Sequence, residues 1–110
     1  MTTAAERIER ERTDVRRRLD ALQARWDAIL EGSELTTNDD EHDPEGSTIA
    51  FERAQVGGLI ADARSELDDL DAALARVETG TYGTCTRCGR PIAEPRLDAL
   101  PATRYCIECA

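Results

Sequence analysis

Apolar residues recur every seven positions in two long stretches of the chain. Residues 3–31 contain two interleaved series, Ile8, Val15, Leu22 and Ile29 with Ala5, Arg12, Leu19 and Trp26, in which Arg12 is the one interruption. A second pair of series runs on to about Thr79 and consists of Ile49, Val56, Ala63, Leu70 and Val77 with Arg53, Ile60, Leu67 and Leu74. Heptad spacing is typical of helices that pack along one narrow apolar seam. The pattern therefore predicts two long helices, each with one such seam.

The segment between the two helices predicts a loop at about residues 32–46. It is polar, acidic and rich in turn-forming residues. Gly32 is placed to end the first helix, because glycine readily adopts the backbone conformation of a helix C-cap. The second helix is expected to start near Asp43-Pro44 or at Ser47, since both offer an N-cap and Pro44 suits the first helical position. Gly80 is placed to end that helix.

The two seams fit an antiparallel hairpin in one register. When Trp26 faces Val56, each seam position of the first helix meets one of the second, and the midpoint of the pairing falls inside the loop. A shift of one helix by one heptad gives an alternative register. A coiled coil between the helices of separate chains is an alternative to the hairpin. The position of the loop favours the hairpin.

Four cysteines near the end of the sequence form two C-x2-C pairs, Cys85, Cys88, Cys106 and Cys109. This spacing is typical of a tetrahedral four-thiolate zinc site, and Gly89 suits the tight turn after the first pair. Four protein ligands leave no open position on the metal, so the zinc is expected to be structural. Two disulfides, a redox-active C-x-x-C pair and an iron–sulfur cluster are the alternatives.

These features together predict a mostly α fold with two parts. Residues 1–80 are expected to form an antiparallel two-helix coiled-coil hairpin with an acidic tip. Residues 81–110 are expected to form a small C-terminal four-cysteine zinc finger.

Composition narrows the class of protein. The chain has 110 residues, of which 34% are charged and 4% are aromatic, so we expect long exposed helices rather than an enzyme with a deep pocket. There is no apolar run of the roughly 20 residues that cross a bilayer, and the N-terminus lacks the apolar stretch of a signal peptide. The sequence is interpreted as a soluble cytoplasmic protein without enzymatic activity.

The negative charge is concentrated in the middle of the chain. The net charge is −9, and the segment between Arg25 and Arg53 has no arginine or lysine. It has nine acidic ones, which are Asp27, Glu31, Glu34, Asp39, Asp40, Glu41, Asp43, Glu45 and Glu52. This distribution argues against binding of nucleic acid through a basic, phosphate-facing surface.

The last 29 residues resemble the DksA/TraR family of four-cysteine zinc-finger transcription regulators. The motif consists of Tyr82, Gly83, Cys85, Cys88, Gly89, Ile92, Arg96, Leu97, Ala99, Pro101, Cys106 and Cys109. The helical hairpin before it is similar to the family's architecture. The resemblance implies direct binding to RNA polymerase, with the hairpin inserted through the secondary channel so that acids at its tip approach the catalytic centre.

The resemblance also implies which residues contact polymerase. The tip set consists of Asp39, Asp40, Glu41, Asp43 and Glu45, and Arg87 and Arg90 are candidate contacts on the finger. The family's tip pattern Asp-x-x-Asp-x-Ala is occupied here by Asp43, Gly46 and Thr48, so only its first aspartate is present. We expect a monomer that binds polymerase without sequence-specific binding to DNA.

Two other functions fit the same residues. A zinc-ribbon adaptor would link proteins through its coiled coil without touching polymerase. A thiol-based redox sensor would use the four cysteines as its switch. Within the polymerase hypothesis, transcript cleavage is a second possible activity, because tip carboxylates can hold the catalytic Mg²⁺.

Overall fold

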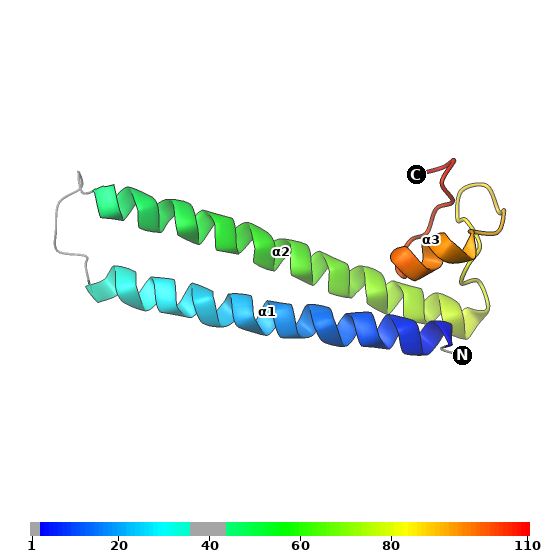
Figure 1. Cartoon of the computed structure of the whole chain (residues 1–110), viewed down its shortest axis with the longest axis horizontal. Helices are drawn as coiled ribbons and strands as arrows, with labels where there is room; N and C mark the ends of the chain where they lie inside the picture. The colour runs from blue at the N-terminus through cyan, green and yellow to red at the C-terminus, as the bar shows by residue number, and fades with distance from the viewer. Residues whose placement is uncertain (1–2, 36–43) are drawn as a thin grey trace. The chain divides into compact units, whose positions relative to one another are not determined.

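Three helices make up most of the computed structural model, which describes residues 3–35 and 44–110 and the side chains of residues 3–32 and 48–110. Helix α1 spans Ala4–Leu35, α2 spans Pro44–Thr79 and the short α3 spans Glu94–Ala99 (Figure 1). The described part of the chain holds no strand beyond an isolated bridge between Thr84 and Pro91. The predicted mostly α fold, with a helix pair followed by a four-cysteine cluster, is confirmed.

The loop predicted at about residues 32–46 is shorter at both ends in the structure, because residues 32–35 belong to α1 and residues 44–46 belong to α2. Pro44 is the first residue of α2, and α2 ends at Thr79 just before Gly80, whose φ is +77°. The prediction that Gly32 ends α1 is wrong, because the helix continues to Leu35. Gly32 is not among the described glycines with positive φ, so it does not adopt the left-handed conformation that ends a helix.

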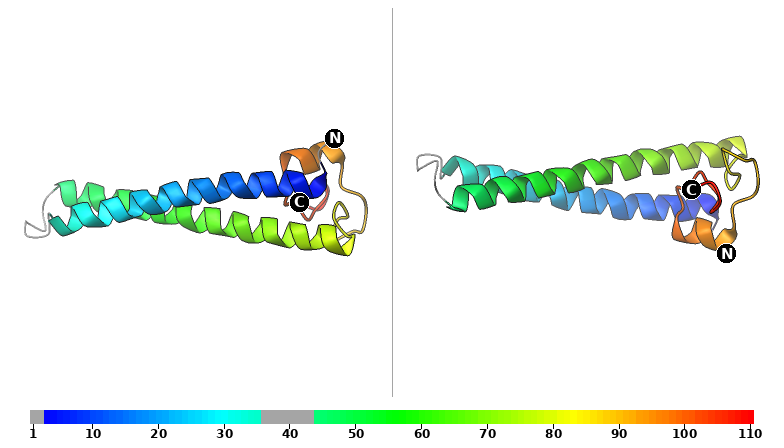
Figure 2. Two further views of the ribbon diagram at one scale, coloured as in Figure 1. Left: turned by 90° about the horizontal axis from the view of Figure 1, so that it is seen from below. Right: turned by 90° about the horizontal axis from the view of Figure 1, so that it is seen from above.

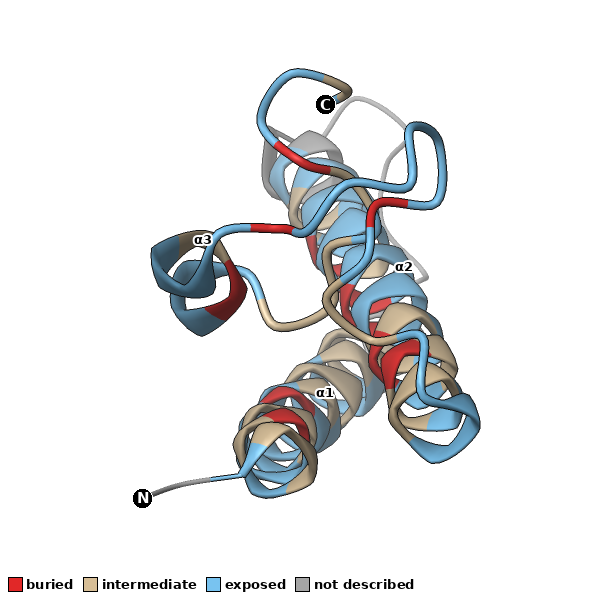
Figure 3. Ribbon diagram, turned by 90° about the vertical axis from the view of Figure 1, so that its right-hand side faces the viewer, coloured by how far each residue is buried: buried red, intermediate tan, exposed pale blue. Residues whose placement is uncertain are grey.

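The chain forms two compact units, residues 16–64 and residues 1–15 with 65–110. In each unit α1 and α2 run antiparallel, side by side in both views of Figure 2. Figure 3 shows that the buried positions of α1 face α2. The predicted division into residues 1–80 and 81–110 stays a prediction.

In the unit of residues 16–64 the seam is built around Trp26. Val56 and Ile60 of α2 are buried, and the Trp26 ring lies 3.2 Å from the position that a Cβ would take on Gly57. Contact with the residue next to Val56 agrees with the predicted register. Arg25 closes one side of the seam through an ion pair with Glu52 at 3.1 Å.

In the other unit, fully buried residues from both helices line the seam. Ile8 and Val15 of α1 are 0% exposed, and Leu70 of α2 is 3% exposed. Arg12 occupies a seam position, and its Nε lies 2.9 Å from Oδ1 of Asp71. This pairing compensates the charge that the heptad pattern places in an apolar row.

One predicted seam position lies outside the seam. All eight seam residues of α1 are at least partly buried, and so are those of α2 except Arg53, which is exposed. A guanidinium buried without a partner loses its hydration, so the long side chain reaches solvent instead. The heptad pattern identifies the packed face of the helix correctly, but it does not show whether a charged residue on that face is buried or exposed.

The adjacent glycines of α2 provide a matched pair of substitutions. Gly58→Ala should raise the free energy of unfolding by about 1 kcal/mol, because alanine is the better helix former. Gly57→Ala should raise the free energy of unfolding by less, because its new Cβ would lie 3.2 Å from Cζ3 of Trp26. The indole borders a hollow of about 290 Å³, so the ring has space to shift and the gain should shrink rather than reverse. Urea unfolding of both variants measures the difference, and equal gains would contradict the close contact.

Candidate metal centre

The first C-x-x-C pair lies in a tight backbone turn. The amide of Gly89 donates to the carbonyl of Cys85 at 3.0 Å, and the amide of Cys85 donates to Arg90 at 2.8 Å. Gly89 has a φ of +75°, which is strained for a residue with a Cβ. The prediction that Gly89 serves the turn after Cys88 is confirmed.

The second pair forms a similar turn, in which the amides of Cys109 and Ala110 both donate to the carbonyl of Cys106 at 3.1 Å. The two turns meet over a small core. Its buried members are Cys85, Ile92, Leu97 and Cys106, with Tyr82, Tyr105 and Cys109 packed against them. Since this core is small, the metal must contribute much of the stability of the finger.

The four sulfur atoms converge on one point. All four Sγ atoms lie within 4.8 Å of one another, and the Sγ atoms of Cys88 and Cys106 are 3.7 Å apart. For Zn–S distances of about 2.3 Å, a tetrahedron sets its sulfurs about 3.8 Å apart. The four cysteines are free, and 3.7 Å is far longer than the roughly 2.05 Å of a disulfide. The set therefore fits a single zinc ion, and four thiolates leave no open position for catalysis.

Zinc uptake should release protons. In the metal-free cluster, backbone hydrogen bonds, that of Cys106 above all, lower the pKa of Cys85 to about 6. A hydrogen bond with the Cys106 thiol, aided by burial, raises the pKa of Cys109 to about 12. At pH 7 Cys85 is mostly a thiolate and Cys109 a thiol, and zinc binds thiolates.

Zinc affinity should therefore rise with pH at and above pH 7 as Cys109 becomes easier to deprotonate, and it should fall more steeply below about pH 6, where Cys85 also becomes protonated. Chelator competition from pH 5 to 9 measures this dependence. Calorimetry in buffers of different ionisation enthalpy counts the protons, and an affinity independent of pH would contradict the assignment.

Arginines join the finger to the helices of the same unit. Arg76 of α2 donates to the carbonyls of Ala102 and Thr103 at 3.3 and 3.4 Å, and Arg104 pairs with Asp69 at 3.3 Å. Arg7 of α1 pairs with Asp98 of α3. Sequence analysis missed these residues, because the period of a seam does not show which arginine reaches a distant carbonyl.

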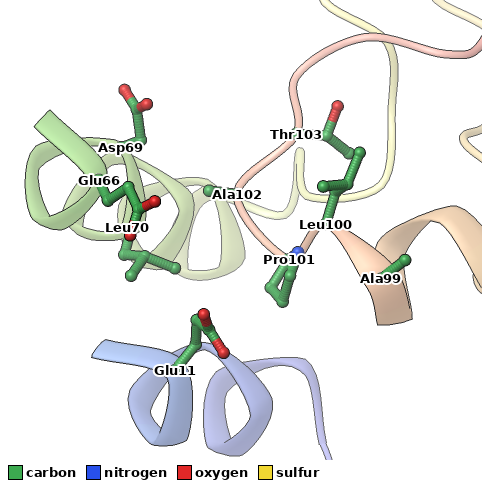
Figure 4. A pocket seen from close by; sticks show the side chains of 9 residues that line it. All are labelled: Glu11, Glu66, Asp69, Leu70, Ala99, Leu100, Pro101, Ala102 and Thr103. Carbon is green, nitrogen blue, oxygen red and sulfur yellow. The ribbon is translucent and has the colours of Figure 1, made fainter. Parts of the chain in front are cut away.

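A cavity of about 320 Å³ lies where the finger meets these helices (Figure 4). Glu11 of α1 and Glu66 and Asp69 of α2 form its acidic side. Leu70 and the segment 99–103 supply the rest of its lining. Because Asp69 is paired with Arg104, part of this acidic side helps to hold the finger in place.

The predicted polymerase contacts differ in what the structure describes of them. Asp39, Asp40, Glu41 and Asp43 lie outside the described residues, as does the side chain of Glu45. Arg87 lies 5.3 Å from the centre of the Tyr105 ring and donates to the carbonyl of Cys109 at 3.3 Å. Arg90 pairs with Glu108 at 3.3 Å. Both arginines are exposed, and each also makes a contact with another residue of the finger.

The fold and the site define a small helical zinc-finger protein. Residues 80–110 match the family described as prokaryotic dksA/traR C4-type zinc finger. General stress protein 16O of Bacillus subtilis is 31% identical over 78 residues, which cover 71% of this chain and 48% of that protein. The RNA polymerase-binding transcription factor DksA of Caulobacter vibrioides is 42% identical over 45 residues, 41% of this chain and 32% of that protein.

A solved structure extends the likeness to the helices. Transcription factor DksA2 from Pseudomonas aeruginosa superposes with a TM-score of 0.56 at 26% identity, covering 94% of this chain and 79% of that one. Residues 80–110 are a zinc finger of the DksA/TraR type, as their motif predicts, and the four cysteines of this finger hold one zinc ion.

Two further facts concern the length of the chain and the apolar character of its helices. The chain spans less than half the length of either of these curated relatives. Within the described residues, no helix combines the length and the apolar character that crossing a bilayer requires.

Proposed function

We propose that this protein binds RNA polymerase directly and regulates transcription. The observation that carries the proposal is the four-thiolate DksA/TraR finger that follows an antiparallel helix pair. In the proposed complex the hairpin, residues 1–80, enters the secondary channel, and the finger, residues 81–110, remains at the surface of polymerase. The protein acts as a cytoplasmic monomer and has no catalytic site of its own.

The charge distribution supports this orientation. Nine acids and no arginine or lysine lie between Arg25 and Arg53, a segment that includes the loop between the helices. A rod with negative charge concentrated near one end is drawn into a positively charged channel that leads to bound metal ions. Asp39, Asp40, Glu41, Asp43 and Glu45 are then the residues that approach the catalytic centre.

The finger offers a second contact. Leu100 and Ile107 are 51% and 78% exposed, and both line an open groove of about 550 Å³ that Arg90 also borders. Exposed apolar side chains next to an arginine are typical of the contact residues of protein interfaces. We propose that Arg90 and its neighbour Arg87 contact the surface of polymerase.

A site-specific crosslink tests the proposal. A photoreactive amino acid in place of His42, within the acidic loop, should crosslink to the large subunits that line the secondary channel of purified bacterial RNA polymerase. The same probe in place of Glu78, in the last turn of α2, should give a different product or none. A loop probe that never crosslinks to polymerase, while the protein retains its zinc, would favour the adaptor function.

A further inference from the structure

One side of α2 is apolar and exposed. Phe51 is 73% exposed and Leu59 is 44% exposed. Gln55 and Gly58 lie between them and are also exposed. Their spacing of four, seven and eight residues from Phe51 places all four on one side of the helix. We call these four residues the Phe51 face.

The composition of this face departs from that of the rest of the chain. Charged residues make up 34% of the sequence, but there is none from Ala54 to Ala61. The buried seam accounts for Val56, Ile60 and the flank of Gly57. A helix that buries one seam normally has charged residues on its opposite side. The Phe51 face instead leaves an aromatic ring and a leucine in water.

Gly58 is an independent sign of a partner. Glycine is a poor residue for a helix interior, and Gly58 is not among the described glycines with positive φ. Among the described residues, no atom lies within 4 Å of the place that a Cβ would take. Neither the backbone conformation nor packing against the described residues explains the glycine. A bare backbone beside Phe51 and Leu59 does allow another molecule to approach closely.

We propose that the Phe51 face docks on an apolar surface of RNA polymerase. This inference rests on the proposed function and names a contact within it. At 1.5 Å per residue, the face lies roughly 10–23 Å along α2 from Pro44, and Pro44 directly follows the acidic loop. A binding site that receives the loop therefore lies within reach of this side of α2.

Charge disfavours a second copy of the chain as the occupant. Phe51 lies at the edge of a segment that has nine acids and no arginine or lysine. Two copies joined through this face would bring two such segments together, and like charges in proximity repel. A partner with apolar patches among basic groups can pack against the Phe51 ring and can also pair with the surrounding acidic residues.

Three variants test the proposal in binding assays with purified bacterial RNA polymerase. Phe51→Ala should weaken binding at least about tenfold, since truncated aromatic anchors dominate interface energies. Gly58→Leu should weaken binding similarly, because it blocks close approach, while it raises the melting temperature through better helix propensity. Ala24→Leu places the same leucine side chain at an exposed position of α1 and should bind like the parent. Zinc content and helical circular dichroism verify that each variant is folded.

The outcomes separate the inference from the function on which it rests. A parent protein that binds polymerase, with Phe51→Ala and Gly58→Leu binding equally well, overturns the docking face and leaves the proposed function in place. A folded, zinc-loaded parent that does not bind polymerase overturns both. A concentration-dependent dimer of the parent that Phe51→Ala abolishes would assign the face to a second copy and overturn the proposal.

Discussion

Cys85→Ser should release the zinc ion and unfold residues 82–110. The Cys85 side chain is 2% exposed and belongs to the core of the finger, so serine removes a metal ligand and places a hydroxyl in an apolar site. Structural zinc contributes on the order of 10 kcal/mol or more to the folding of small fingers. The apolar core of the finger is too small to replace that contribution.

Unfolding should extend into the helices only where the finger contacts them. Arg76 would lose its two carbonyl acceptors, Asp69 its partner Arg104, and Arg7 its partner Asp98. Hydrogen exchange should therefore accelerate through the finger and the last turns of α2, and residues 16–64 should keep most of their protection. Native mass spectrometry should show one zinc in the parent and none in the variant. Thr84→Ser, in the same loop, is the control, and a metal-free variant with unchanged exchange would refute the structural role.

The features predicted correctly from the sequence are those with a strict local pattern. Heptad spacing identified the side of each helix that packs, because a helical residue points in a direction set by its number. Proline and glycine identified the start of α2 and its end, because their backbone preferences are local. Two C-x2-C pairs identified the zinc site for the same reason, since each pair holds two ligands in one turn.

The features that were missed depend on contacts between distant segments. Ala73 is 0% exposed although no seam position predicts it. It lies four residues after Asp69 and three before Arg76, on the side of α2 that bonds to the finger. Gly57 lies in a helix interior, where glycine is unfavourable, but the structure gives it the contact with Trp26. In both cases the explanation is a neighbour that no heptad pattern identifies.

The second large effect is expected at the acidic loop. Replacing Asp39, Asp40 and Asp43 with Asn and Glu41 with Gln should leave zinc content and helicity unchanged, because these residues lie outside both seams and the finger. Regulation of transcription should fall sharply. Electrostatic steering raises association rates by roughly 10- to 1,000-fold and depends on the charge near the contact. Removing four of nine acids should therefore slow entry of the hairpin, and any contact of the carboxylates with the catalytic centre is lost as well.

The control separates local charge from total charge. Replacing Glu9 with Gln and Asp14, Asp20 and Asp68 with Asn changes the net charge equally at exposed positions outside the acidic middle segment. In transcription assays with purified polymerase, this control should act like the parent, whereas the loop variant should lose most of its effect. The effect of the parent should also weaken as salt rises, because exposed charges are screened within about 10 Å at 0.1 M ionic strength. A finger contact can preserve affinity after the loop is neutralised, so activity is the decisive measurement. If both quadruple variants match the parent, the acidic segment does not act on polymerase, and the finger or the Phe51 face must account for regulation.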